Sequence, residues 1–273
     1  MRRSLVTLFL IAMILAACGR TATTPTTRPL PTTAVPDTTT SHEVTAETTT
    51  TTAPALGAPE NPIQILFAPL VETEVIASGG EVMRAALEEA TGLSFEVPAP
   101  SSYAATIEEM CAAPERTMAF MTGIGYVLAR NLCGVDVALK AVRFGYDVYW
   151  SQFLVRRDSD IASIEDLGGL SWAYPDAGST SGYMVPLLAL REAGVEPGAT
   201  LETGNHTRAA LAVYRGDAEF ATTFYSPPLL PEGHWQEGDD PDIPLDLVPE
   251  CAATDEGQLW CGDLRVLDSR ALA

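Results

Sequence analysis

Strand-like and helix-like segments alternate along most of this chain, and this alternation restricts the possible folds more than any other feature. Between residues 63 and 132, three short apolar runs that suit buried strands are each followed by a segment with helical spacing. Such a series favours a largely parallel sheet with helices on both faces. The expected strands are residues 63–67, 93–97 and 117–123, and the expected helices are residues 81–90, 101–110 and 124–132.

A second series begins after residues 139–145. Because the alternation restarts there, two α/β lobes fit better than one continuous sheet. We expect residues 61–146 to form the first lobe and residues 147–273 the second. The second lobe has expected strands at residues 149–157, 170–174 and 218–224, a short helix at 163–169, a helix ending near residue 193, and a helix at 207–216.

The first 18 residues predict a lipoprotein signal peptide. Arg2 and Arg3 precede an apolar run of about 13 residues, which is shorter than the roughly 20 that span a bilayer. The run ends in LAACG, a bacterial lipobox pattern, so Cys18 is the expected lipidation site. An ordinary signal peptide with a coincidental cysteine is the alternative. Residues 19–60 are rich in Thr, Pro and Ala, and we expect them to form a disordered tether.

The charge balance excludes one class of partner. The chain has 16 Lys and Arg against 36 Asp and Glu, which gives a formal net charge of −20. Nucleic acid is therefore not an expected partner, because phosphate backbones bind clustered cations. Paired carboxylates, metal-ligand clusters and Ser-His-Asp arrangements do not stand out in the sequence, so we expect neither an enzyme nor a cofactor.

Apart from Cys18, the chain has four cysteines, which are Cys111, Cys133, Cys251 and Cys261. An even number in an exported chain indicates disulfides, although four cysteines permit three pairings. We expect the local pairs, Cys111 with Cys133 and Cys251 with Cys261. A zinc site is the alternative, but the sequence has no C-x-x-C motif and its histidines are not near the cysteines, so no metal is expected.

Residues 176–183, DAGSTSGY, lie between an expected strand and an expected helix. The free amides of a helix's first turn and the positive end of its dipole favour an anion. Ser179, Thr180 and Ser181 add hydroxyl donors at the same place, and Gly178 and Gly182 allow the backbone to approach closely. This turn is therefore a candidate anion site.

Two other kinds of functional turn do not fit this stretch. A nucleophile elbow needs serine at the centre of G-x-S-x-G, whereas Thr180 is central here. A phosphate loop of the ATP-binding kind needs a lysine that this stretch lacks. A plain helix cap with additional serines stays open as the alternative.

Residues 163–197, SIEDLGGLSWAYPDAGSTSGYMVPLLALREAGVEP, resemble a signature of the phosphonate, phosphite and phosphate-binding proteins of ABC transporters. In that family D-L-x-G-K precedes a strand, and P-x-S-T-S-G-[YF]-x-x-P opens the next helix. Here Leu170 replaces the lysine, and Pro175 lies two residues earlier than the pattern asks. TGNHTRAALAVYRGDAEFAT (residues 203–222) and SSYAATIEEM (residues 101–110) are similar to two further family motifs.

The resemblance covers residues 63–224 and implies a two-lobed type 2 periplasmic-binding-protein fold. Each lobe would be a mainly parallel sheet flanked by helices, with the ligand in the cleft. The hydroxyl residues would bind the phosphorus oxyanion, the histidine would donate to the same group, and two tyrosines would line the cleft. The implied ligand-binding residues are Ser179, Thr180, Ser181, Gly182, His206, Tyr103 and Tyr149. His206 could instead cap the helix that starts at residue 207, and the tyrosines could be core edges.

Glu219 stands where the family has an aspartate, so it is a further candidate, as an acceptor for a protonated oxyanion. The alternative is that this position only closes the lobe. The sequence also departs from the family near its end. The segment that returns to the first lobe is absent, so we expect either a truncated product or a first lobe that is completed differently. Residues 231–261 form a longer connection that we expect to be an acidic loop fixed by Cys251–Cys261.

The resemblance implies a lipid-anchored substrate-binding component of an ABC importer, outside the cytoplasm on the bacterial membrane. Its expected partners are a small phosphorus oxyanion and the transporter permease, and a monomer would suit the expected hinge motion. The alternatives are a ligand-sensing protein of a signalling system on the same fold, and a truncated remnant that binds nothing.

Overall fold

The computed structural model describes residues 53–143, 145–227, 229–230, 233–236, 238–242 and 263–272. The signal peptide, Cys18, most of the tether and the Cys251–Cys261 pair lie outside the described residues. No helix in these ranges has the length and hydropathy that crossing a bilayer requires.

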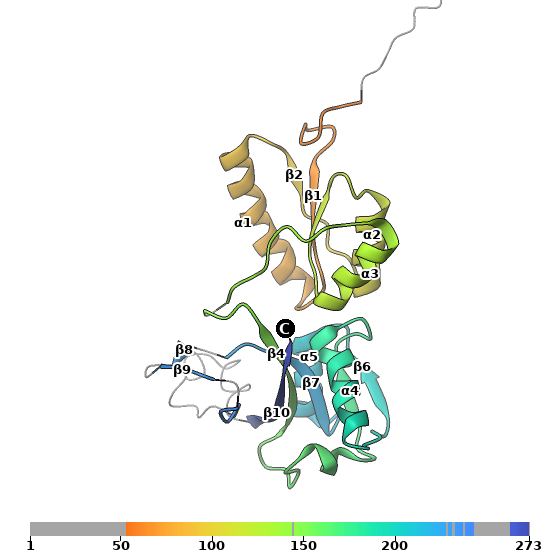
Figure 1. Cartoon of the computed structure of the whole chain (residues 1–273), viewed down its shortest axis with the longest axis vertical. Coiled ribbons are helices and arrows are strands. Elements are labelled where there is room, and N and C mark those ends of the chain that lie inside the picture. The colour runs from red at the N-terminus through yellow and green to blue at the C-terminus, as the bar shows by residue number, and fades with distance from the viewer. Residues whose placement is uncertain are drawn as a thin grey trace, which may run out of the picture. The chain divides into compact units, whose positions relative to one another are not determined.

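The first sheet contains three parallel strands in the order β2-β1-β3. Figure 1 shows α1 on one side of this sheet and α2 and α3 on the other, as the alternation of segments predicts. We call this part, residues 63–133, the first lobe. Its elements in chain order are β1 (Ile63–Phe67), α1 (Thr73–Thr91), β2 (Phe95–Glu96), α2 (Tyr103–Ala112), β3 (Thr117–Phe120) and α3 (Gly123–Cys133).

Helix α1 begins eight residues before the expected start at residue 81. The pair Gly79-Gly80 lowers the helix propensity of this region, which is why the sequence pattern misses its first two turns. Gly80 is nevertheless needed for packing, because a Cβ atom at this position would lie 2.5 Å from Cγ1 of Val97. The glycine therefore allows α1 to pack closely against Val97, the residue that follows β2.

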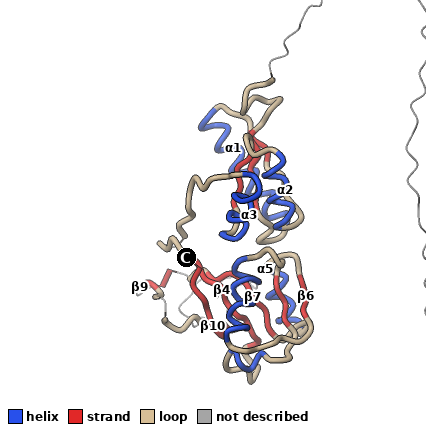
Figure 2. The backbone as a smooth tube through the Cα atoms, turned by 45° about the vertical axis from the view of Figure 1, so that its right-hand side comes forward, coloured by secondary structure: helices blue, strands red, loops and turns tan. Residues whose placement is uncertain are grey.

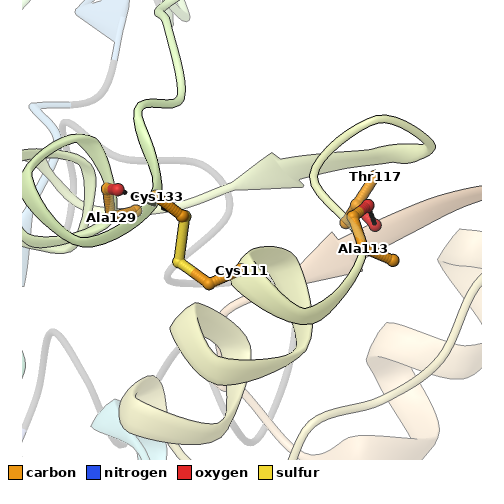
Figure 3. The surroundings of a disulfide bond; sticks show 5 residues. All are labelled: Cys111, Ala113, Thr117, Ala129 and Cys133. Atoms are coloured by element: carbon orange, nitrogen blue, oxygen red, sulfur yellow. Dashed lines mark hydrogen bonds between the residues drawn. A yellow bond between two sulfur atoms is a disulfide. The ribbon is translucent and has the colours of Figure 1, made fainter.

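Helices α2 and α3 are joined by a disulfide between Cys111 and Cys133, the pair expected from the sequence. The Cα atoms of the two cysteines are 5.4 Å apart, and the disulfide links the C-terminal ends of the two helices (Figure 3). Each helix begins at a capping residue: Ser102 Oγ accepts from Ala105 N, and Thr122 Oγ1 accepts from Gly125 N. The opposite, N-terminal ends of the same helices carry residues of the candidate site.

The second sheet contains five strands in the order β10-β4-β7-β5-β6. We call the described residues between 149 and 272 the second lobe. Figure 2 shows its strands beside one another, in red, with α5 packed against them. Its elements are β4 (Tyr149–Arg156), the 3-10 turn η1 (Ile164–Leu167), β5 (Trp172–Tyr174), the π-helical turn η2 (Thr180–Met184), α4 (Val185–Glu192), β6 (Thr200–Glu202), α5 (His206–Arg215), β7 (Phe220–Tyr225) and β10 (Leu264–Leu272), with a separate hairpin of β8 (Leu229–Leu230) and β9 (Gly233–His234).

The expectation of a mainly parallel second sheet is wrong, because the sheet is mixed. Strand β7 pairs with β5 in parallel, but β4 runs antiparallel to both β7 and β10. Parallel neighbours need a long, usually helical crossover, and η2 and α4 provide one between the parallel strands β5 and β6. Strand β4 is not a neighbour of β5, because β7 lies between them. Strand β10 was not expected from the sequence, and it adds a strand to the sheet beside β4.

Both faces of the central strands of the second sheet are buried. Along β4, Phe153 and Val155 pack in one apolar cluster with Trp172 and Leu190, whereas Leu154 packs in another with α5. A strand that is buried on both faces reads as a continuous apolar run rather than as an alternating one. The turns that leave the ends of β5 and β7 therefore start from well-packed strands.

Candidate functional site

The glycine-serine turn leaves the carboxyl end of β5 and opens the helical segment formed by η2 and α4. Ser179 Oγ accepts a hydrogen bond from Gly182 N over 3.0 Å, so this serine caps η2. The side chains of Ser179, Thr180 and Ser181 are almost completely buried, at 0%, 8% and 2% exposed. Three buried hydroxyl groups in one turn need polar partners, because an unpaired buried polar group is costly.

The backbone of the turn is held by hydrogen bonds from two strands of the same lobe. Ser151 Oγ, on β4, donates to the carbonyl oxygen of Ser181 over 2.7 Å, and Thr222 Oγ1, on β7, donates to the carbonyl oxygen of Gly182. Gly182 is thus held by hydrogen bonds at both its amide and its carbonyl group. Its part in the site is to let the turn pack, because a Cβ atom there would lie 2.2 Å from Cγ of Pro175.

We expect Gly182→Ala to lower the free energy of unfolding by about 2 kcal/mol, because the added methyl group collides with the Pro175 ring and forces the turn to move. Chemical denaturation monitored by tryptophan fluorescence measures the loss. Gly168→Ala is a matched control, since the nearest atom to a Cβ at Gly168 is 3.9 Å away. Equal stability of the two variants would contradict this role of Gly182.

His206 is the first residue of α5 and is 2% exposed. Asn205, not His206, caps the helix, since Asn205 Oδ1 accepts from Arg208 N over 2.9 Å. The Nδ1 atom of His206 accepts from the backbone N–H of Phe224 over 3.2 Å. A neutral ring with an acceptor at Nδ1 carries its proton at Nε2, so Nε2–H is a donor directed at the site.

The Nε2 atom of His206 contacts residues of both lobes. It lies 3.2 Å from the hydroxyl oxygen of Tyr103, the first residue of α2, and 3.5 Å from Ser179 Oγ. Burial lowers the pKa of His206 to about 3 and raises the pKa of Tyr103 above its usual range. Both side chains are therefore neutral near pH 7.

The low pKa of His206 has a measurable consequence. A histidine whose pKa is depressed in the folded state contributes stability that is complete above its unfolded pKa, near 6.5, and is lost as the pH falls. We expect the parent protein to lose about 2 kcal/mol more unfolding free energy than His206→Asn between pH 6.5 and pH 4.5. Urea denaturation across this window measures the difference. Parallel pH profiles for the two proteins would contradict a buried neutral histidine.

Tyr149, the first residue of β4, is the second tyrosine of the site. Burial raises the pKa of Tyr149, and hydrogen bonds with the side chains of Ser181 and Thr180 partly offset this rise. In addition, Thr180 Oγ1 accepts from the backbone N–H of Ile124 over 3.2 Å. Ile124 lies in the first turn of α3, so the first lobe reaches the turn through a backbone amide as well.

The structure thus places six of the predicted side chains together, and they are Tyr103, Tyr149, Ser179, Thr180, Ser181 and His206. It adds Ile124, which the sequence reasoning missed. The available signal was residues 122–125, TGIG, a strand-to-helix turn with the same small residues as the turn in the second lobe. The N-terminal ends of α2, α3 and α5 and the turn before α4 meet here, which favours a negative charge.

Glu219 does not belong to this group. It lies just before β7, and its carboxylate accepts from both the N–H and the hydroxyl of Ser171, just before β5. Because β5 and β7 are parallel, these positions are at the amino ends of the strands, whereas Ser179 follows the carboxyl end of β5. Glu219 closes the opposite end of the sheet, so its assignment as a ligand acceptor is corrected.

Two α/β lobes that meet through the N-terminal ends of their helices define a two-lobed type 2 periplasmic-binding-protein fold. Solved structures share this fold. The binding-protein component of an ABC phosphonate transporter from Pseudomonas aeruginosa aligns with 76% of this chain and 64% of its own, at 20% identity and a TM-score of 0.56. PhnD1 from Prochlorococcus marinus, in complex with methylphosphonate, aligns with 76% of this chain and 72% of its own, at 16% identity and a TM-score of 0.58.

Residues 65–233 match the family model of the periplasmic phosphonate substrate-binding proteins of ABC transporters. The chain therefore belongs to this family, whose members are extracytoplasmic transporter components and not enzymes. The phosphate-import protein PhnD of Mycolicibacterium smegmatis is 32% identical over 152 aligned residues, in a match that covers 50% of this chain and 47% of that protein. The chain thus spans about half the length of this relative.

Proposed function

We propose that this protein binds a small phosphorus oxyanion between its two lobes and serves as the substrate-binding component of an ABC importer. The observation that carries the proposal is the convergence of buried, neutral donors from both lobes on one point. These donors are the hydroxyl groups of Tyr103, Ser179 and Thr180 and Nε2–H of His206. His206 Nε2 contacts Tyr103 of the first lobe and Ser179 of its own lobe, and Thr180 accepts from the Ile124 amide of the first lobe. A tetrahedral oxyanion can accept from several of them at once.

Neutral donors suit a transport protein with a strongly acidic chain. The net charge of −20 repels anions at long range, but preorganised hydroxyl groups, backbone amides and helix dipoles act locally. They also recognise the oxyanion without a buried cation, whose desolvation would be costly. A ligand that bonds to both lobes stabilises the arrangement in which the lobes are together, which is the form that a permease would recognise.

The relatives support the choice of ligand class. The structural neighbour from Prochlorococcus marinus is described in complex with methylphosphonate, and the relative from Mycolicibacterium smegmatis is described as a phosphate-import protein. Both ligands present a tetrahedral group with oxygen atoms that carry negative charge. We therefore propose phosphonate, phosphite or phosphate as the ligand class for this chain.

The N-terminal sequence completes the proposal. We propose that the expected signal peptide and lipobox lead to a lipid anchor at Cys18 on the outer side of the cell membrane, to which residues 19–60 would tether the lobes. In this arrangement a monomeric binding protein stays close to its permease.

Calorimetric titration of the protein with phosphate, phosphite, methylphosphonate, aminoethylphosphonate and sulfate tests the proposed ligand class. We expect at least one phosphorus oxyanion to bind with micromolar or lower Kd, and sulfate is the comparison anion without phosphorus. The absence of heat with every phosphorus compound, from protein with a cooperative unfolding transition, would contradict the proposal.

A further inference from the structure

Beside the candidate site, one carboxylate joins the two lobes without touching the ligand donors. Glu72 directly precedes α1 in the first lobe, and its carboxylate accepts from two residues of the second lobe. Asn205 Nδ2 donates to Oε1 over 3.0 Å. Arg208 donates from Nε to Oε1 over 2.9 Å and from Nη2 to Oε2 over 2.6 Å. Such a two-pronged arginine–carboxylate contact is the most directional kind of ion pair.

The position of Asn205 connects this contact to the site. Asn205 is 5% exposed, and its amide is used at both ends: Nδ2 donates to Glu72, and Oδ1 caps α5 at Arg208 N. The next residue is His206, whose backbone N–H donates across the lobes to the carbonyl oxygen of Leu70 over 3.3 Å. The carboxylate of Glu72 therefore holds the first turn of α5, which carries the histidine.

We propose that Glu72, Asn205 and Arg208 form an interlobe clasp that positions His206 and raises ligand affinity without contacting the ligand. The affinity part rests on the proposed function. The clasp forms only when the lobes are together, so it increases the fraction of the protein in the binding-competent arrangement. The apparent Kd of a ligand falls in proportion to that fraction.

The size of the effect follows from the exposure of the clasp. The side chains of Arg208 and Glu72 are 58% and 35% exposed, and exposed ion pairs contribute modestly. Hydrogen bonds from Arg208, and then from Asn205, lower the pKa of Glu72, so this carboxylate is ionised at neutral pH. Glu74 also acts on Arg208 electrostatically. We therefore expect changes of a few-fold to about 20-fold, which decrease in high salt.

The test is a set of charge variants of the full chain, titrated with the phosphorus oxyanion that binds the parent most tightly. Glu72→Gln should raise Kd about five-fold, and Glu72→Arg, which places two guanidinium groups together, about 20-fold. The double variant Glu72→Arg/Arg208→Glu exchanges the two charges and should recover most of the lost affinity. Such non-additive recovery would not follow from general damage to the fold. Glu81→Gln is the matched control, because it removes the same charge from an ion pair within α1.

Hydrogen exchange gives a second result that needs no ligand. The amides of His206 and Ile124 both donate across the lobes, to Leu70 O and Thr180 Oγ1. In Glu72→Arg both should exchange faster than in the parent, whereas the amides of β4 should not change.

Unchanged exchange at His206 and Ile124 in Glu72→Arg would overturn the clasp. A Kd of Glu72→Arg within about twofold of the parent value would overturn it as well. If no oxyanion binds the parent protein, the hydrogen-exchange result alone tests the clasp. Faster exchange would then support the clasp while the proposed function fails.

Discussion

Ser179→Ala/Thr180→Ala should weaken binding of the phosphorus oxyanion about 1,000-fold. Each hydroxyl group is proposed to donate to a charged oxygen atom, and a hydrogen bond to a charged group contributes about 1.5–3 kcal/mol. The loss of two such bonds corresponds to roughly 4 kcal/mol of binding free energy, which is three orders of magnitude in Kd. Calorimetric titration of parent and variant at the same temperature measures the change.

The control for this variant is Ser78→Ala/Thr91→Ala, which removes two exposed hydroxyl groups from α1. Its Kd should equal that of the parent. Ser179 also caps η2, so the thermal unfolding of the double variant must show that it is folded at the temperature of the titration. A folded Ser179→Ala/Thr180→Ala protein that binds as tightly as the parent would contradict the proposed role of the turn.

Cys111→Ser/Cys133→Ser should lower the free energy of unfolding by about 3 kcal/mol. The bond closes a loop with a sequence separation of 22 residues, and loss of this constraint increases the entropy of the unfolded chain. The bridge also joins the ends of α2 and α3 opposite Tyr103 and Ile124. Urea denaturation of the parent and the double variant measures the difference.

The effect on binding separates stability from positioning. If the disulfide acts on the unfolded chain alone, the folded variant keeps the Kd of the parent within a few-fold. A stability loss below about 1 kcal/mol would mean that packing in the first lobe already fixes α2 and α3.

The turn at residues 176–183 could be predicted from the sequence because its determinants are local. Small residues between a strand and a helix, with a serine at the capping position, favour one geometry whatever the rest of the fold does. The helices at 103–112 and 123–133 were likewise expected within about two residues, since periodicity and caps define them. Tyr103 and His206 entered only through the resemblance to a family, because no local pattern relates residues 103 positions apart.

The features that the sequence did not predict depend on distant parts of the chain. The antiparallel pairing of β4 with β10 joins residues more than 100 positions apart, and no pattern within either strand specifies its neighbour. Glu219 was assigned by its place in a motif, but the direction of β7 determines which end of the sheet it occupies. Glu72 gave no signal because its partners, Asn205 and Arg208, lie in the other lobe.

A crystal structure of the protein with the phosphorus oxyanion that binds most tightly tests the central claim most directly. We predict oxygen atoms of the ligand within hydrogen-bond distance, about 3 Å, of Ser179 Oγ, Thr180 Oγ1 and His206 Nε2. A ligand bound elsewhere, with these three groups still bonded to their protein partners, would contradict the assignment of the site.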